Sequence, residues 1–210
     1  MDPSLFLADL EEKPARLLAL AEALRADDPW AAVGETRRWV FLGMGSSHYA
    51  AQVAAAPLRA RGVDAVAESA GSDLLPVVGP GTTVVAVSAS GGSRETVDAV
   101  RRLSGTGARF VALTNRSDTE LEALCDLGVA MLAGPERGGV ACRSFQHTLA
   151  LLLALEGDPS ALSADLALAA EASAHLLAGR DTWLPALSAA ALGPHGTHVA
   201  APVRRLSSAL

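Results

Sequence analysis

The chain has 210 residues, half of them hydrophobic, which is enough to form one large domain with a full core. Its formal net charge of −6 and the lack of a basic run argue against a protein that binds the phosphate backbone of DNA or RNA electrostatically. The acidic N-terminus lacks the charge pattern of a signal peptide, and no uninterrupted apolar run reaches membrane-spanning length, so we expect a cytoplasmic protein without a membrane segment.

The first 30 residues predict an N-terminal helical arm. Residues 4–25 carry leucine and alanine at helical spacing, and Asp27-Asp28-Pro29 ends the pattern. Pro14 must bend this helix or start a new one, because proline lacks the backbone N–H that a helix interior requires. The apolar face of the arm is expected to dock on the domain that follows.

Residues 31–178 alternate short apolar runs with helical patterns. Strands are expected at 39–42, 63–67, 84–87, 108–113 and 128–132. Helices are expected at 49–61, after Ser93 with apolar positions at Val97 and Val100, and at 119–124, 144–155 and 161–177. Residues 69–75 fit either a loop or a short helix. This alternation predicts an α/β fold, a doubly wound five-stranded parallel sheet in an α/β/α sandwich.

Two turns rich in glycine and serine follow expected strands, at residues 43–48 and 88–93. Carboxyl ends of parallel strands meet at one edge of a sheet, where ligands bind. The free N–H groups at the helix starts attract anions, phosphate above all. We interpret the second turn as a phosphate cradle in which Gly91 and Gly92 leave room for the ligand and Ser93 caps the helix. The alternative is that both turns only join a strand to a helix.

Other chemistries fit the sequence less well. The first turn lacks the third glycine of a dinucleotide fingerprint, and the serines lack a G-x-S-x-G context for a catalytic triad. Cys125 and Cys142 show no disulfide or metal spacing, so reduced thiols and no metal or cofactor are expected. His48 could donate to a phosphate, shuttle a proton or face solvent, whereas His147 lies in an apolar helix and is expected to be a packing residue.

Residues 84–96, VVAVSASGGSRET, resemble the S-x-S-G-x-T/S signature of sugar isomerase (SIS) domains, particularly the first lobe of the isomerase half of glutamine-dependent glucosamine-6-phosphate synthase. Residues 45–47 are similar to the G-T/S-S turn of that family, and residues 112–115 to the strand end that follows. Residues 9–14 resemble its E-I-x-E-Q-P segment, residues 125–126 its Ala-Asp pair, and residues 134–145 its G-x-E-x-x-V-A-S-T-K-x-F loop.

The resemblance implies a set of residues that hold a phosphorylated sugar: Gly45, Ser46, Ser47, Ser88, Ala89, Ser90, Ser93, Gly139 and Ala141. Ala89 stands where the synthase has a glutamine, and Ala141 replaces a serine, so two side-chain contacts of the family are lost here. Glu136 matches an acidic residue of the family loop, or it forms a solvated turn with Arg137.

The implied function is binding of a phosphorylated sugar or amino sugar, as an aldose–ketose isomerase or deaminase-like protein or as part of one. Family members take a glutamate, a lysine and a histidine from a second lobe or a neighbouring subunit, so the catalytic residues stay unassigned. We expect residues 179–210 to form a linker and the start of an incomplete second lobe, with a strand near 195–202. The alternative for residues 193–202 is a flexible tail. The alternative is a non-catalytic sensor of sugar phosphates. The resemblance also implies a homodimer.

Overall fold

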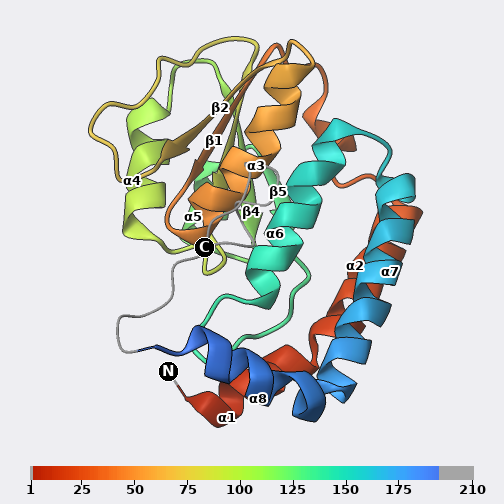
Figure 1. Ribbon diagram of the computed structural model, residues 1–210. Coiled ribbons are helices and arrows are strands. Elements are labelled where there is room, and N and C mark those ends of the chain that lie inside the picture. Colours follow the sequence, from red (N-terminus) through yellow and green to blue (C-terminus); the bar gives the residue numbers. More distant parts are fainter. Residues whose placement is uncertain (1, 194–210) are drawn as a thin grey trace.

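The computed structural model describes residues 2–193 and contains the predicted parallel sheet (Figure 1). Its strands are β1 (Arg38–Gly43), β2 (Asp64–Ser69), β3 (Thr82–Val87), β4 (Arg109–Thr114) and β5 (Leu127–Ala130). They pair in the order β2-β1-β3-β4-β5, with every neighbouring pair parallel. The chain therefore winds outward in both directions from β1, which confirms the doubly wound α/β fold.

Helices cover both faces of the sheet, because alternate side chains of each strand point to opposite sides. Val85 and Val87 belong to the core shared with α2 (Lys13–Ala26), α3 (Ser46–Ala60), α6 (Arg143–Leu153) and α7 (Pro159–Ala178). Val84 and Ala86 belong to the core shared with α4 (Arg94–Leu103) and α5 (Glu120–Leu124). A strand buried on both faces reads as a continuous apolar run, as residues 84–87 do.

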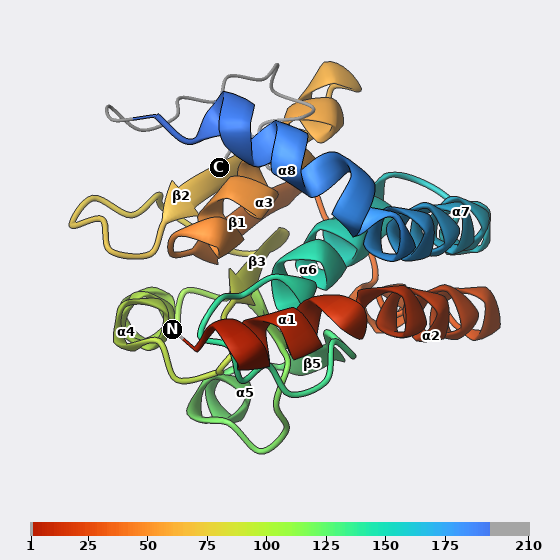
Figure 2. The same cartoon turned by 60° about the horizontal axis from the view of Figure 1, so that its bottom comes forward.

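The arm is a pair of helices, α1 (Pro3–Glu11) and α2, and the predicted break at Pro14 is confirmed, since this proline lies in the first turn of α2. Leu17, Leu20 and Leu24 are buried where α2 lies alongside α7 (Figures 1 and 2). By length and composition alone α7 could cross a membrane, which is weak evidence because helices of soluble proteins pass the same test. Here α7 packs along α2.

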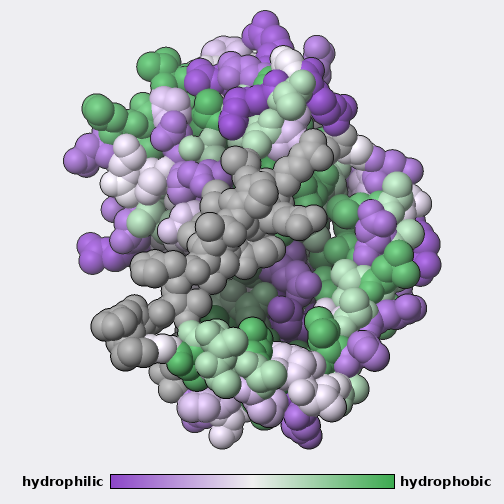
Figure 3. Space-filling view, viewed as in Figure 1, coloured by the Kyte–Doolittle hydropathy of each residue, from purple (hydrophilic) through white to green (hydrophobic). Residues whose placement is uncertain are grey.

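A further helix, α8 (Arg180–Ala191), occupies the stretch that was expected to be a linker. None of its residues is buried, and Leu184 and Leu187 leave apolar surface exposed over this helix (Figure 3). The Arg180 guanidinium binds Glu11 at the end of α1, with 2.8 Å between Nη1 and Oε1. The strand expected near 195–202 lies outside the described residues.

Candidate functional site

The two predicted turns leave the sheet side by side. β1 and β3 are neighbours, and Gly43 at the end of β1 is in register with Val87 at the end of β3. The strand order reverses at this point, because β2 lies beyond β1 whereas β4 lies beyond β3. Such a switch point is where doubly wound sheets bind ligands.

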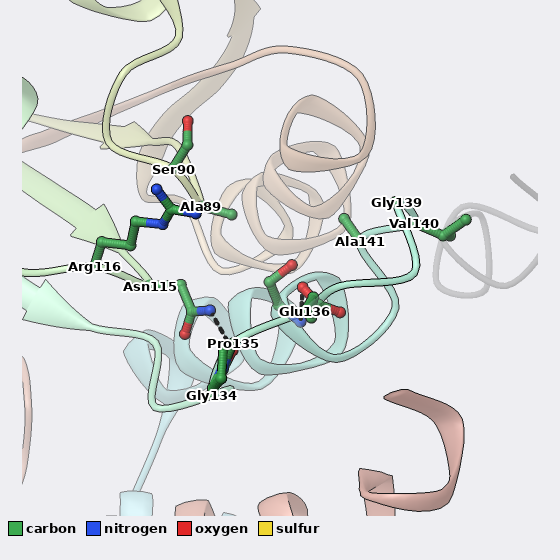
Figure 4. Close-up of a pocket in the computed structure, with 11 residues that line it drawn as sticks. Ala89, Ser90, Asn115, Arg116, Gly134, Pro135, Glu136, Gly139, Val140 and Ala141 are labelled. Atoms are coloured by element: carbon green, nitrogen blue, oxygen red, sulfur yellow. Dashed lines mark hydrogen bonds between the residues drawn. The ribbon is translucent and has the colours of Figure 1, made fainter. Parts of the chain in front are cut away.

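A cavity of about 420 Å³ opens at this edge (Figure 4). Its volume lies in the range typical of small-molecule sites. The walls come from the turn after β3, the segment after β4, the loop between β5 and α6, and the first turn of α6. The lining residues are Ala89, Ser90, Asn115, Arg116, Gly134, Pro135, Glu136, Gly139, Val140, Ala141 and Ser144.

Four of the nine predicted binding residues line this cavity: Ala89, Ser90, Gly139 and Ala141. Ser88 is buried, and its Oγ accepts a hydrogen bond from the Ser93 backbone N at 3.4 Å. Gly45, Ser46 and Ser47 lie at the start of α3, beside the turn that follows β3 and outside the cavity lining.

Two details of the predicted cradle were wrong. Ser93 stands at the N-cap position of α4, but its side chain makes no capping bond, because its hydroxyl donates instead to Glu95 Oε2 at 3.1 Å. A Cβ on Gly91 would collide with the Thr119 side chain. The missing side chain at Gly91 therefore makes room for the start of α5 rather than for a ligand.

Arg116 brings the one positive side chain among the lining residues of the described chain. It follows the end of β4, and its guanidinium extends toward Ala89 and Ser90 across the cavity mouth (Figure 4). Ser90 Oγ accepts a hydrogen bond from Gly92 N of the same turn at 3.3 Å. A guanidinium beside a hydroxyl and a glycine turn offers several donors to an anion.

Asn115 and Glu136 use their polar atoms to fix the cavity walls. The Asn115 amide donates to Gly134 O at 2.8 Å and accepts from Ala133 N at 3.0 Å, which holds the loop after β5. Glu136 Oε1 accepts from Cys142 N at 2.8 Å and Arg143 N at 2.6 Å, so this carboxylate caps α6. The alternative of a solvated turn at Glu136 is therefore wrong.

Ser144 lines the cavity and carries a buried hydroxyl. The residue is 1% exposed, and its Oγ has no hydrogen-bond partner among the described groups. Buried hydroxyls are normally paired, because an unpaired one loses the bonds that water would give it. An unpaired hydroxyl at a cavity wall therefore indicates a place for a polar ligand group.

The two histidines that the sequence analysis considered lie outside the lining. His147 is buried as predicted, with 2.7 Å between Nδ1 and Met131 O, so Nδ1 carries the proton. Burial lowers its pKa and outweighs the opposing effect of that hydrogen bond. His48 lies in the first turn of α3, where Nε2 is 2.9 Å from Gln52 Nε2.

Comparison with protein families gives a match between the SIS domain model and residues 34–156. The chain belongs to the SIS domain family. It is 32% identical over 160 residues to a glutamine–fructose-6-phosphate aminotransferase (isomerizing) of Aeropyrum pernix, which covers 73% of this chain and 26% of that protein. This SIS chain thus spans about a quarter of the length of the curated relatives it matches.

Solved structures share the SIS fold. A candidate phosphosugar isomerase from Silicibacter pomeroyi aligns with a TM-score of 0.72 at 22% identity, covering 89% of this chain and 60% of that one. The C-terminal domain of glucosamine-fructose-6-phosphate aminotransferase from Francisella tularensis aligns with a TM-score of 0.66 at 20% identity, covering 89% and 57%. These likenesses confirm the fold that the sequence predicted.

Arg116 and Ser144 are polar lining residues of this SIS domain that sequence reasoning missed. Arg116 directly follows Asn115 at a predicted strand end, so the rule that strand ends carry ligand contacts could have found it. Ser144 had no such signal, because a serine at the start of an apolar helix usually serves as a cap.

Proposed function

We propose that this SIS domain binds a phosphorylated sugar or amino sugar in the cavity at the ends of β3 and β4. The observation that carries the proposal is that Arg116, Ser90 and Ser144, whose buried hydroxyl is unpaired, line one cavity. A sugar phosphate has one anionic end and several hydroxyls, which matches these groups. The Aeropyrum relative is named for fructose 6-phosphate, which supports the same ligand class for this chain.

The phosphate would bind at the wall formed by residues 88–93 and Arg116. Guanidinium groups bind phosphate through two parallel N–H donors, and this charge-assisted pair is stronger than neutral hydrogen bonds. Ser90 adds a hydroxyl, and Gly92 has no neighbouring atom within 4 Å of the position a Cβ would take, which leaves its backbone open to a ligand. Ser46, Ser47, Ser88 and Ser93 lie outside the cavity lining, so the proposed phosphate wall does not depend on direct contacts from them.

The sugar would bind against the loop that carries Gly139 and Ala141. Both residues are exposed and small, so they leave space for a ring without making side-chain hydrogen bonds. Ser144, in the first turn of α6, lines the same cavity and is proposed to bond one sugar hydroxyl. Specificity for one sugar would then depend on which hydroxyl meets Ser144.

The lining supports binding more directly than catalysis. Isomerisation needs an acid or base that can reach the substrate proton. The one carboxylate that lines the cavity of the described chain is Glu136, and both of its oxygens already accept backbone N–H groups of α6. An isomerase-like activity would therefore require a proton-transfer group from outside this lining, for example from the partner subunit of the expected homodimer.

Isothermal calorimetry with fructose 6-phosphate, glucosamine 6-phosphate and unphosphorylated fructose tests the proposal. We expect saturable binding of a phosphorylated sugar and none of fructose. Arg116→Gln should weaken binding about tenfold or more, since a charged hydrogen bond contributes about 1.5–3 kcal/mol. Arg25→Gln removes the same charge from an exposed site on α2 and should leave binding unchanged. Equal affinity for fructose, or no binding up to about 10 mM, which corresponds to a free energy near −3 kcal/mol, would refute the proposal.

A sensor and an isomerase differ in turnover. Incubation with fructose 6-phosphate, with and without ammonia, followed by product analysis separates them. Saturable binding without product favours the sensor, whereas formation of an aldose phosphate or amino sugar phosphate favours the enzyme.

A further inference from the structure

One loop supplies most of the sugar wall of the cavity. We define the cavity loop as residues 134–141, six of which line the cavity. The loop contains no helix or strand. Because it lacks a hydrogen-bonded ladder of its own, its shape must be set by the groups packed around it.

Asp9 of α1 binds the backbone of the cavity loop. It is 4% exposed, and its Oδ2 accepts from Arg137 N at 2.8 Å and from Gly138 N at 2.7 Å. Its other oxygen, Oδ1, accepts from Arg143 Nη2 at 3.1 Å. A single carboxylate thus joins the arm, the loop and the start of α6.

Arg143 completes this cluster from the α6 side. It is fully buried, and its guanidinium forms ion pairs with Asp9 and Glu12 and donates to Pro135 O. Burial alone would raise the pKa of Glu12, but Arg16 and Arg143 hold it below its ordinary value. Removing one partner of a buried ion pair leaves the other charge uncompensated, which destabilises the folded state.

The loop also lies directly on the backbone of α1. A Cβ on Gly138 would collide with the Phe6 backbone, so only glycine allows this approach. Figure 2 shows α1 passing close to the loop that leads into α6. The backbone contact with Phe6 and the hydrogen bonds to Asp9 therefore both fall at Arg137 and Gly138 of the cavity loop.

From these contacts we infer that α1 sets the shape of the sugar wall, with Asp9 and Arg143 as positioning residues. Neither residue lines the cavity, and α1 lies outside residues 34–156 that match the SIS model. The inference rests on the proposed function, because it concerns the affinity of that same cavity. The phosphate wall is formed by other segments, so α1 governs recognition of the sugar and not of the phosphate.

The test compares Asp9→Asn with Glu11→Gln in the full chain. Asn keeps the size of Asp9 but removes its charge and one of its two accepting oxygens, so an N–H₂ group must face either the loop amides or the Arg143 guanidinium. Glu11 is two residues away and contacts Arg180 on the surface, so its variant controls for charge. We expect D9N to weaken the binding of fructose 6-phosphate about tenfold or more, since a small displacement of the residues that contact a ligand can have an effect of that size. The Kd for inorganic phosphate should stay within about twofold of the value for the unsubstituted chain in both variants, a difference of about 0.4 kcal/mol.

Gly138→Ala is a second route to the same displacement, because it forces the loop off α1 without changing any charge. If D9N does not fold, the ligand pattern of G138A decides in its place. A folded D9N that binds fructose 6-phosphate as the unsubstituted chain does would overturn the inference. Equal loss of fructose 6-phosphate and inorganic phosphate would overturn it as well.

Amide hydrogen exchange separates this inference from the proposed function. The Arg137 and Gly138 amides should exchange faster in D9N than in E11Q, with or without ligand. If the unsubstituted chain binds no sugar phosphate, the proposed function fails, and the exchange of these two amides still decides whether Asp9 shapes the loop. Unchanged exchange at both amides would show that it does not.

Discussion

Replacing Ser144 by alanine should stabilise the fold and weaken ligand binding at the same time. An unpaired buried hydroxyl costs about 1–3 kcal/mol, and alanine removes it while improving helix propensity in α6. Allowing for the small space left behind, we expect the free energy of unfolding to rise by ~1 kcal/mol. For a chain of this size that corresponds to a rise in Tm of roughly 2–4 °C.

Binding should move in the opposite direction. Loss of one hydrogen bond worth about 0.5–1.5 kcal/mol should weaken the binding of fructose 6-phosphate roughly two- to tenfold. Urea unfolding and calorimetry measure the two effects on the same preparation. Thr148→Val is the matched control, since Thr148 is buried one turn further along α6 and its hydroxyl donates to Met131 Sδ at 3.5 Å. The reasoning is refuted if S144A is destabilised, or if it binds the sugar phosphate as tightly as T148V does.

Three further effects are expected. Glu136→Ala should lower the free energy of unfolding, measured in urea, by about 2–3 kcal/mol, because the Cys142 and Arg143 amides lose their cap. Glu136→Gln should lower it less, because the glutamine oxygen can still accept. Burial lowers the pKa of His147 below 6.5, so the unfolded chain binds a proton more readily than the folded one. The free energy of unfolding should therefore be highest above pH 6.5 and fall as the pH drops below it. His147→Asn should remove this pH dependence of the urea midpoint. Burial, together with the charges of Asp126 and Glu122, raises the pKa of Cys125 to about 12, so iodoacetamide should modify it far more slowly at pH 8 than it modifies free cysteine.

The strands and most helices could be predicted because their apolar patterns are dictated by burial. Residues 84–87 are apolar without interruption since both faces of β3 are covered, and a break at Pro14 follows from its missing N–H. The end of β5 was placed too late because Leu132 adopts a positive φ of 59° and leaves the strand direction. α8 gave no periodic signal, because none of its residues is buried and Pro185 lies inside it.

The candidate site was only partly predictable, because it combines local and distant contacts. The motif around residues 88–93 indicated Ala89 and Ser90, which line the cavity, but it could not indicate that the Ser88 hydroxyl turns inward to Ser93 N. The cavity loop depends on Asp9, which lies more than 120 residues earlier in the chain. Such a contact leaves no trace in the spacing of nearby residues.

A net charge of −6 does not conflict with a phosphate ligand. At physiological ionic strength charges are screened beyond about 8 Å, so a small anion responds to the groups of the cavity and not to the whole surface. A nucleic acid needs many cations over a long stretch, whereas one phosphate needs only a few donors. Arg116 and the turn after β3 provide such a local group at the edge of the sheet where the two serine turns meet.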